Sequence, residues 1–281
     1  MTEARPPGED LIQEECENEA VEEATGLSPR LIFETIRRNG EEELERPIRA
    51  LWWSGIAAGL LISFSVLGKA VFKTHLPEAS WSPLVENLGY SLGFLMVILG
   101  RMQLFTENTI TTVVPVMLRG DKASFLRTAR LWAVVLAANV VGAFLIASFF
   151  ALTPVLDADL RAAMVKISEH ATGMPPLIGL ISGIPSGILI AAIVWMLPSA
   201  QHSEIPLIVI FTWMIAAGDF THIVAGSVEM AFLMVQGLLP LGQAIFGFFI
   251  PVLVGNVIGG TAVFTVLTYA QIKPEIPEHR P

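Results

Sequence analysis

The feature that most constrains this chain is a series of apolar blocks, each long enough to cross a lipid bilayer. They occupy approximately residues 48–71, 84–118, 124–152, 176–198, 205–237 and 241–270. A transmembrane helix needs about 20 consecutive apolar residues. Hydrophobic residues make up 53% of the chain, which excludes an ordinary soluble globule. The sequence therefore predicts an all-α integral membrane protein with six transmembrane helices.

The second and fifth blocks are too long for one simple span, and each carries polar residues at its centre. The second contains LFTEN at residues 104–108, and the fifth contains GDFTH at residues 218–222. Ionisable residues inside a membrane are costly and usually line a path or a site. Irregular backbone is tolerated there only where it faces a cavity or other protein. We therefore expect helices 2 and 5 to be broken at mid-membrane, beside a functional site.

Three pairs of short matches, in the same order, indicate that the chain repeats itself. They pair residues 54–62 with 182–190, 105–106 with 220–221, and 139–143 with 256–260. Each copy, 47–152 and 175–271, holds three spans, so the second copy must enter the membrane from the opposite side. This arrangement is an inverted 3+3 repeat, and its site is expected where the two broken helices meet.

The segments outside the spans have distinct compositions. They divide into an acidic, disordered tail at 1–27, an amphipathic helix at 28–46 that lies on the membrane or the bundle, the six-span domain at 47–271, and a C-terminal tail at 272–281. Arginine and lysine residues precede the first block and flank the connection between the second and third. By the positive-inside rule both termini are cytoplasmic.

The repeat predicts that Thr106 and His222 converge near the midplane, with Thr221 beside them. Two half-helices that begin there direct their N-termini at one place, which suits a small anion. Histidine is the side chain most readily switched between charge states near neutral pH. The sequence leaves two roles open for His222, which either interacts with the permeating anion or only holds the break in shape.

Other residues near the two breaks are candidates for supporting roles. Phe105 and Phe220 are candidate apolar constrictions. Gating or vestibule roles are assigned to Glu107, Asn108, Asp219 and Glu229, with helix capping as the alternative for Glu107 and Asp219. His170, in the predicted 153–175 loop, is expected to be an ordinary loop residue. Histidine and cysteine spacings typical of metal sites are missing from the sequence, so neither a metal nor a cofactor is expected.

At these positions the chain resembles the formate/nitrite transporter family. The matching segments are Leu104-Phe105-Thr106, GDFTH at 218–222, which resembles the family's Gly-Phe-Glu-His, AIVWM at 192–196 and GNVIGG at 255–260. The resemblance covers about residues 46–270. It implies an aquaporin-like protomer in the inner (plasma) membrane, a homopentamer with one pore per subunit, and passage of small anions such as formate or nitrite. Carried over, Thr106 and His222 are the central pair, and Leu104 and Phe220 are constriction residues.

The chain departs from the family's pattern around the histidine. Thr221 stands where the family has glutamate, and Gly226 and Gly187 stand where it has asparagines. In the family these groups surround the histidine with a polar network. Together with the long acidic N-terminus and the LFTEN segment, the departures indicate a divergent branch and leave its substrate open.

The leading interpretation is a channel or transporter for small monovalent anions, such as a monocarboxylate or nitrite, or for their conjugate acids. The alternative within transport is a pore for small neutral solutes or water. A scaffold or receptor that uses the acidic tail is a further alternative. An enzyme is not expected, because no Ser/His/Asp or metal constellation occurs at a suitable depth. No nucleic-acid partner is expected.

Overall fold

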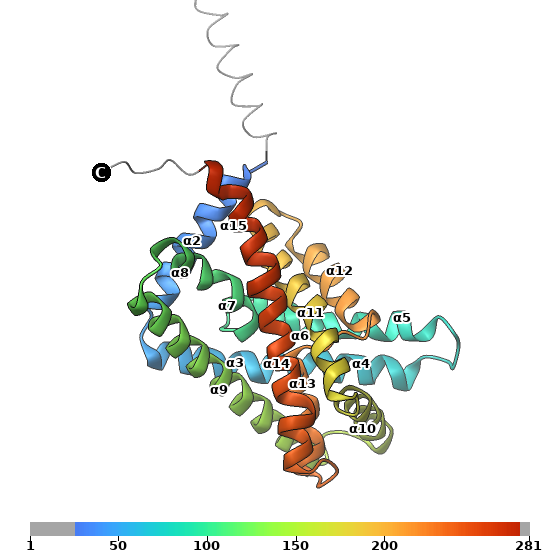
Figure 1. Cartoon of the computed structure of the whole chain (residues 1–281). Helices are drawn as coiled ribbons and strands as arrows, with labels where there is room; N and C mark the ends of the chain where they lie inside the picture. The colour runs from blue at the N-terminus through green and yellow to red at the C-terminus, as the bar shows by residue number, and fades with distance from the viewer. Residues whose placement is uncertain (1–25, 276–281) are drawn as a thin grey trace, which may run out of the picture.

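The computed structural model describes residues 26–275, and every regular element in that range is a helix (Figure 1). Most of the predicted acidic tail and the last residues of the C-terminal tail lie outside the described residues. The first repeat contains α3 (Ile48–Leu61), α4 (Ser63–His75), α5 (Ser82–Glu86), η1 (Asn87–Tyr90), α6 (Ser91–Leu99), α7 (Phe105–Thr111), α8 (Val113–Arg119) and α9 (Lys122–Leu152). The second contains α11 (Pro176–Met196), η2 (Leu197–Ser199), α12 (Glu204–Ala217), α13 (Ile223–Val235), η3 (Gln243–Phe249), α14 (Ile250–Val257), η4 (Ile258–Thr265), α15 (Val266–Ile272) and η5 (Lys273–Glu275). Helix α2 (Pro29–Glu45) precedes the first repeat, and α10 (Ala158–Thr172) joins the two.

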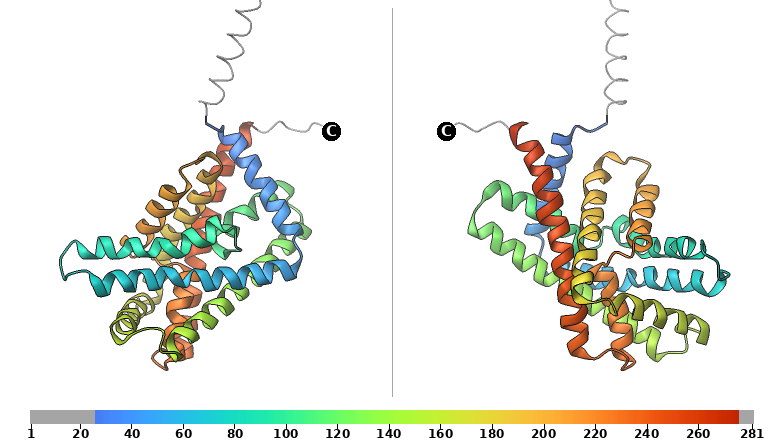
Figure 2. Two further views of the ribbon diagram at one scale, coloured as in Figure 1. Left: turned by 180° about the vertical axis from the view of Figure 1, so that it is seen from behind. Right: turned by 45° about the vertical axis from the view of Figure 1, so that its right-hand side comes forward.

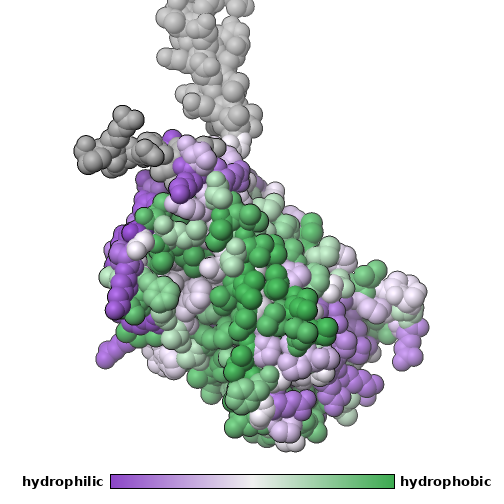
Figure 3. Space-filling model, in the orientation of Figure 1, coloured by the Kyte–Doolittle hydropathy of each residue, from purple (hydrophilic) through white to green (hydrophobic). Residues whose placement is uncertain are grey.

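The helices account for six membrane crossings. Five segments are long and apolar enough to cross a bilayer, namely Ile48–His75, Ser82–Leu99, Lys122–Leu152, Pro176–Ser199 and Gln243–Ile272. The sixth crossing is made by two shorter apolar helices, α12 and α13, in series. Apolar side chains form a broad band across the face in Figure 3, and hydrophilic side chains gather at its left edge near α8 and at its lower right near α10. The predicted six-helix membrane fold is confirmed.

Helix α2 packs against the bundle through one apolar face. Ser28 caps its N-terminus by accepting a hydrogen bond from the backbone N–H of Leu31. The buried residues Ile32, Phe33 and Ile36 contact an apolar cluster contributed by α7, α8, α11 and α15. Gly40 allows the close approach, because a Cβ there would lie 2.0 Å from the carbonyl oxygen of Thr111. The helix therefore lies on protein at the end of the bundle that carries the described chain ends, here called the termini end (Figure 2).

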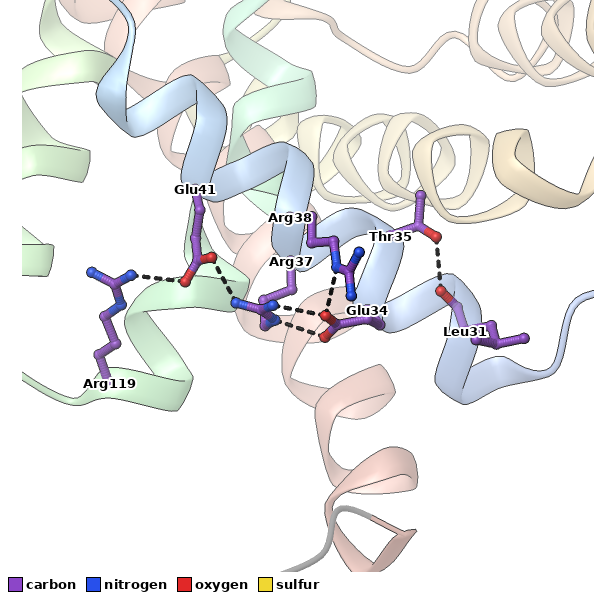
Figure 4. Close-up of polar contacts among 7 residues, drawn as sticks. All are labelled: Leu31, Glu34, Thr35, Arg37, Arg38, Glu41 and Arg119. Carbon is purple, nitrogen blue, oxygen red and sulfur yellow. Dashed lines mark hydrogen bonds and ion pairs between the residues drawn. The ribbon is translucent and has the colours of Figure 1, made fainter. Parts of the chain in front are cut away.

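A chain of ion pairs on α2 reaches across to α8 (Figure 4). The Glu34 carboxylate accepts from Arg37 and Arg38 at 2.7 and 2.8 Å, and Arg37 also contacts Glu41 at 2.7 Å. Glu41 accepts from Arg119 at 2.8 Å. The hydrogen bond from Arg37 lowers the pKa of Glu34 to about 2. Burial alone would raise the pKa of Glu41, but hydrogen bonds from Arg119 and Arg37 bring it below its ordinary value.

The lowered pKa of Glu34 predicts that α2 stays in place at mildly acidic pH. A carboxyl whose pKa is lowered on folding adds its full stability above its ordinary pKa of 4.5, and that stability is lost progressively as pH falls from 4.5 through the folded value of about 2. Spin labels at Leu31→Cys and Lys122→Cys, in a Cys16→Ser background, should report the same distance distribution at pH 5.5 and 7.5. A longer distance at pH 5.5 would contradict the prediction.

Both broken spans stop in the same way. In α6 the N–H of Met102 bonds to the carbonyl of Val97, and in α12 the N–H of Phe220 bonds to that of Ile215. The residue before each of these N–H groups adopts left-handed backbone, with φ of 50° at Arg101 and 56° at Asp219. This pattern is a Schellman motif, a helix end that usually has glycine at the left-handed position. Two polar residues therefore stop the spans at mid-membrane.

Two buried asparagines hold the restarted backbones. The Asn139 side chain accepts from the N–H of Phe105 and donates to the carbonyls of Gly55 and Gln103, at 2.8 to 2.9 Å. Asn256 makes the matching three bonds, from the N–H of Ile223 and to the carbonyls of Gly183 and Thr221. Both asparagines are fully buried. Each one satisfies backbone groups that the break leaves without helical partners.

This correspondence confirms the inverted repeat but corrects one predicted match. Because Asn139 contacts Phe105 where Asn256 contacts Ile223, these two positions are equivalent. The predicted match of Phe105 with Phe220 is therefore wrong by three residues. Two shared letters are too short a signal to fix register where the backbone leaves the helical repeat.

The connection predicted as a loop at 153–175 is largely helical. Asp157 caps α10 by accepting from the N–H of Leu160 at 2.8 Å, and Met164 and Ile167 are buried where α10 packs on α4 and α13. The sequence analysis missed this helix because charges of both signs interrupt its apolar residues, so it lacks the long apolar run that marks a span. Helix α10 and the turn between α4 and α5 lie away from the described chain ends (Figures 1 and 2), at what we call the α10 end.

We predict that Asn139→Ala and Asn256→Ala each destabilise the protein by at least about 2 kcal/mol. Each orphaned buried backbone group costs about 1–3 kcal/mol. For a chain of this size that loss corresponds to a fall of about 4–8 °C in the melting temperature, measured on detergent-solubilised protein. Leu152→Ala, on α9 at a side chain that is 72% exposed, is the control. Equal melting temperatures for all three variants would contradict the role of the asparagines.

Candidate functional site

The two breaks meet at a direct contact between Thr106 and His222. Thr106 lies in the first turn of α7, and His222 is the residue before α13. The Oγ1 of Thr106 and the Nε2 of His222 are 2.9 Å apart, and the two residues are 1% and 2% exposed. The convergence predicted from the repeat is therefore present, and it brings the N-terminal ends of two half-helices together inside the bundle.

The hydrogen bonds of His222 define which ring nitrogen carries the proton. Its Nδ1 accepts from the backbone N–H of Ala225 at 3.3 Å, so the side chain acts as the N-cap of α13. In the neutral ring the proton is then on Nε2, which donates to the Thr106 hydroxyl oxygen. The Thr106 hydroxyl keeps its own proton to donate. The pair therefore supplies two donors at one place.

Aromatic residues surround this pair, and one of them was missed by the sequence analysis. Phe94 of α6 is fully buried and packs edge-on against the His222 ring, with centroids 5.0 Å apart. The predicted constriction residue Phe105 packs edge-on against Trp132 and is 2% exposed. Leu104 precedes α7 and is also buried, whereas Phe220 borders a cavity beside His222. Only a periodic apolar pattern marks Phe94 in the sequence, so nothing distinguished it from other helix residues.

A small cavity opens toward His222 from the α10 end. Its volume is about 40 Å³, room for about three water molecules at about 10–15 Å³ each. Besides His222 and Phe220 it is lined by the ionisable residues Lys69, His170, Asp219 and Glu229. The histidine is therefore reached by a path of mixed charge.

The residues that line this cavity come from different helices, and two of them, Asp219 and Glu229, are predicted gating or vestibule residues. Glu229 lies on α13 two turns beyond His222 and is 6% exposed. Lys69 comes from α4, with its Nζ 5.9 Å from the centre of the Tyr90 ring. Thr221 borders the same cavity, but its hydroxyl donates to the carbonyl of Gly179 at 2.7 Å. Thr221 thus supports the break rather than presenting its hydroxyl to His222.

The structure excludes one of the two alternatives for Asp219 and corrects the prediction for His170. Asp219 does not cap α13, because His222 does. Instead both carboxylate oxygens of Asp219 accept from Nε2 of His170, at 2.8 and 2.9 Å. His170 lies near the C-terminal end of α10 and is not an ordinary loop residue. Sequence spacing gave no hint of this contact, which joins residues 49 positions apart.

At the termini end the candidates Glu107 and Asn108 lie just beyond the break. The Asn108 amide donates to the Gln103 side chain at 3.1 Å, and Gln103 donates to Glu43 of α2 at 2.7 Å. This series of bonds ties α2 to the broken span. The Oε1 atom of Glu107 is buried and makes no hydrogen bond to the residues that the structure describes.

The Phe248 ring occupies the space that a side chain at position 226 would need. A Cβ on Gly226 would lie 2.4 Å from Cζ of Phe248, which is 3% exposed. The position where the resemblance implies an asparagine is therefore filled from η3. Within residues 26–275, no group of three His, Cys, Asp or Glu side chains is arranged to hold a metal ion.

Comparisons with known proteins agree on one family. The sequence model described as Formate/nitrite transporter matches residues 30–270. The chain is 44% identical to Inner membrane protein YfdC of Escherichia coli (strain K12), over 89% of this chain and 80% of that protein. It is 26% identical to Formate channel FocA of Haemophilus influenzae, over 74% and 81%. The solved structure described as a pentameric formate channel with formate bound superposes with a TM-score of 0.69 at 22% identity, over 81% and 98%, so that likeness shows the fold alone.

We predict that Gly226→Ala destabilises the protein by about 1–3 kcal/mol, because an extra methyl in a packed site forces its neighbours to shift. Gly242→Ala is the matched control, since nothing lies within 4 Å of a Cβ there. Adding Phe248→Leu should relieve the loss. Melting temperatures of the detergent-solubilised variants test this, and equal losses for the two alanine variants would show that Phe248 does not limit the site.

Proposed function

Because the chain belongs to the formate/nitrite transporter family, we propose that it conducts small monovalent anions or their conjugate acids through a pore in each protomer. Relatives and structural neighbours that carry the names of formate channels support this assignment. The observation that carries it is the buried contact between Thr106 and His222, where the N-termini of two half-helices meet. Such termini present N–H groups and partial positive charge to an anion.

The proposed passage uses the two donors of the central pair. A carboxylate or nitrite that reaches His222 accepts from its Nε2–H and from the Thr106 hydroxyl in place of their mutual bond. Burying a bare anion is costly unless every lone pair is satisfied. Phe94 and the other apolar side chains offer no hydrogen bonds. Crossing this layer is therefore easiest for the protonated acid, while the anion is held at the donors.

The same comparisons support proposals on assembly and location. The chain is a multi-pass membrane protein, and its relative YfdC is named an inner membrane protein. We propose that it forms a homopentamer, as the pentameric formate channel does. The arginine and lysine pattern of the short loops supports cytoplasmic termini. The termini end would then face the cytoplasm and the α10 end the opposite compartment.

Solute flux into proteoliposomes tests the proposal. Formate and nitrite should enter, faster at pH 5.5 than at pH 7.5 because more of each solute is protonated. His222→Ala should lower this flux by at least about 10-fold, since removing one charge-assisted donor costs about 1.5–3 kcal/mol. Thr106→Val should lower it less.

His75→Ala is the matched control, because His75 is exposed and lies outside the site. It should leave the flux unchanged. Formate flux that is equally fast in wild type and His222→Ala would make the histidine purely structural. Glycerol flux without any formate flux would instead support a pore for neutral solutes.

A further inference from the structure

His170 and Asp219 are bonded to each other in the lining of the cavity that leads to His222. Both residues line it, one from the end of α10 and the other from the break between α12 and α13. Their side chains are 66% and 59% exposed in the single chain, so both lie at the mouth, the outer side of the cavity, rather than at its buried end. The central pair makes no use of either residue. A specific contact in the lining of a cavity that reaches His222 can affect how a solute enters it.

The backbone of Asp219 is built to present its carboxylate at this place. Asp219 occupies the left-handed position of the Schellman motif that ends α12, with φ of 56°. Glycine is the usual residue there, and asparagine and aspartate are the side chains that tolerate it best. A glycine would end the helix equally well and would leave His170 free. The residue present instead places a carboxylate 2.8 Å from the imidazole Nε2.

The charges around the mouth make this contact consequential. Lys69 and Glu229 face the cavity from α4 and α13, and Asp219 adds a second carboxylate. On α10, Lys166 and Glu169 lie within one turn of His170. An anion that approaches His222 therefore meets two carboxylates against one lysine inside the cavity. His170 is the remaining donor at the mouth, and it is already bonded to Asp219.

We propose that His170 is the first binding residue for a small carboxylate at the α10 end, and that Asp219 is a tethered competitor occupying that position until the solute replaces it. This inference rests on the proposed anion path. The head group of an aspartate side chain is chemically a small carboxylate, so the bound Asp219 shows how formate would sit on Nε2 of His170. Exposed pairs of this kind are weak, which makes the exchange easy.

A double-mutant cycle on formate flux at pH 7.5 separates competition from simple charge removal. Asp219→Asn keeps the left-handed backbone and removes the competing charge, so it should lower the half-saturating formate concentration about two- to fivefold. His170→Ala should raise it by a similar factor. In the double variant the gain from Asp219→Asn should vanish, because its target is gone.

The matched control is Glu169→Gln, which removes a carboxylate next to His170 without touching the His170–Asp219 contact. It should change the half-saturating concentration by less than the Asp219 variant does. The lower half-saturating concentration could persist in the double variant, or Glu169→Gln could produce it as well. Either result would show that Asp219 acts only through the effect of its negative charge on the surroundings, and would overturn the proposal. No change in Asp219→Asn would overturn it as well.

A flux-independent measurement separates this proposal from the proposed function. In detergent-solubilised protein, formate should shift the imidazole NMR signals of His170, assigned by His170→Ala, at lower concentration in Asp219→Asn than in wild type. Such shifts without any liposome flux would support the mouth site while rejecting the channel function. If flux is normal but formate does not shift the His170 signals, the proposed binding site at His170 is overturned while the proposed channel function stands.

Discussion

The structure depends on satisfying backbone hydrogen bonds at the middle of a membrane. No water is available there to replace the bonds that a broken helix loses. Asn139 and Asn256 supply them, each through one acceptor and two donor bonds, and each comes from the long helix that follows its broken span in the same repeat. Close packing of these long helices on the first spans of the repeats positions the amides. A Cβ at Gly59 or Gly187 would lie 2.1 or 2.3 Å from the carbonyl of the corresponding asparagine.

Once both breaks are held, the site follows from geometry. Two restarted helices in inverted orientation must direct their N-termini toward each other, and the residues at those termini become neighbours. His222 therefore has two tasks in one side chain, since Nδ1 caps α13 while Nε2 faces Thr106. The structural role of His222 and the anion-binding role proposed for it do not exclude each other, because they use different nitrogens of the ring.

The surroundings of the pair are particular to this chain. Phe248 fills the space beside Gly226, and the Thr221 hydroxyl is bound to Gly179. Polar groups that the family resemblance implies near the histidine are thus replaced by packing. The charged groups lie farther out, at the mouth formed with α10. Selection by charge would then occur before the solute reaches the central layer.

The sequence by itself determined the number of spans, the inverted repeat, the two broken helices and the meeting of Thr106 with His222. Apolar length, polar interruptions and repeated glycines and asparagines are local or periodic signals, and lipid imposes them directly on the residues. Only the tertiary structure decided the register of the breaks, the helix at Ala158–Thr172, the packing of Phe94 on His222 and the bond between His170 and Asp219. The packing of Phe94 on His222 and the bond between His170 and Asp219 join segments far apart in the chain, and such contacts depend on how the helices pack, which no local pattern of residues records. The helix at Ala158–Thr172 is local, but charges of both signs interrupt its apolar residues.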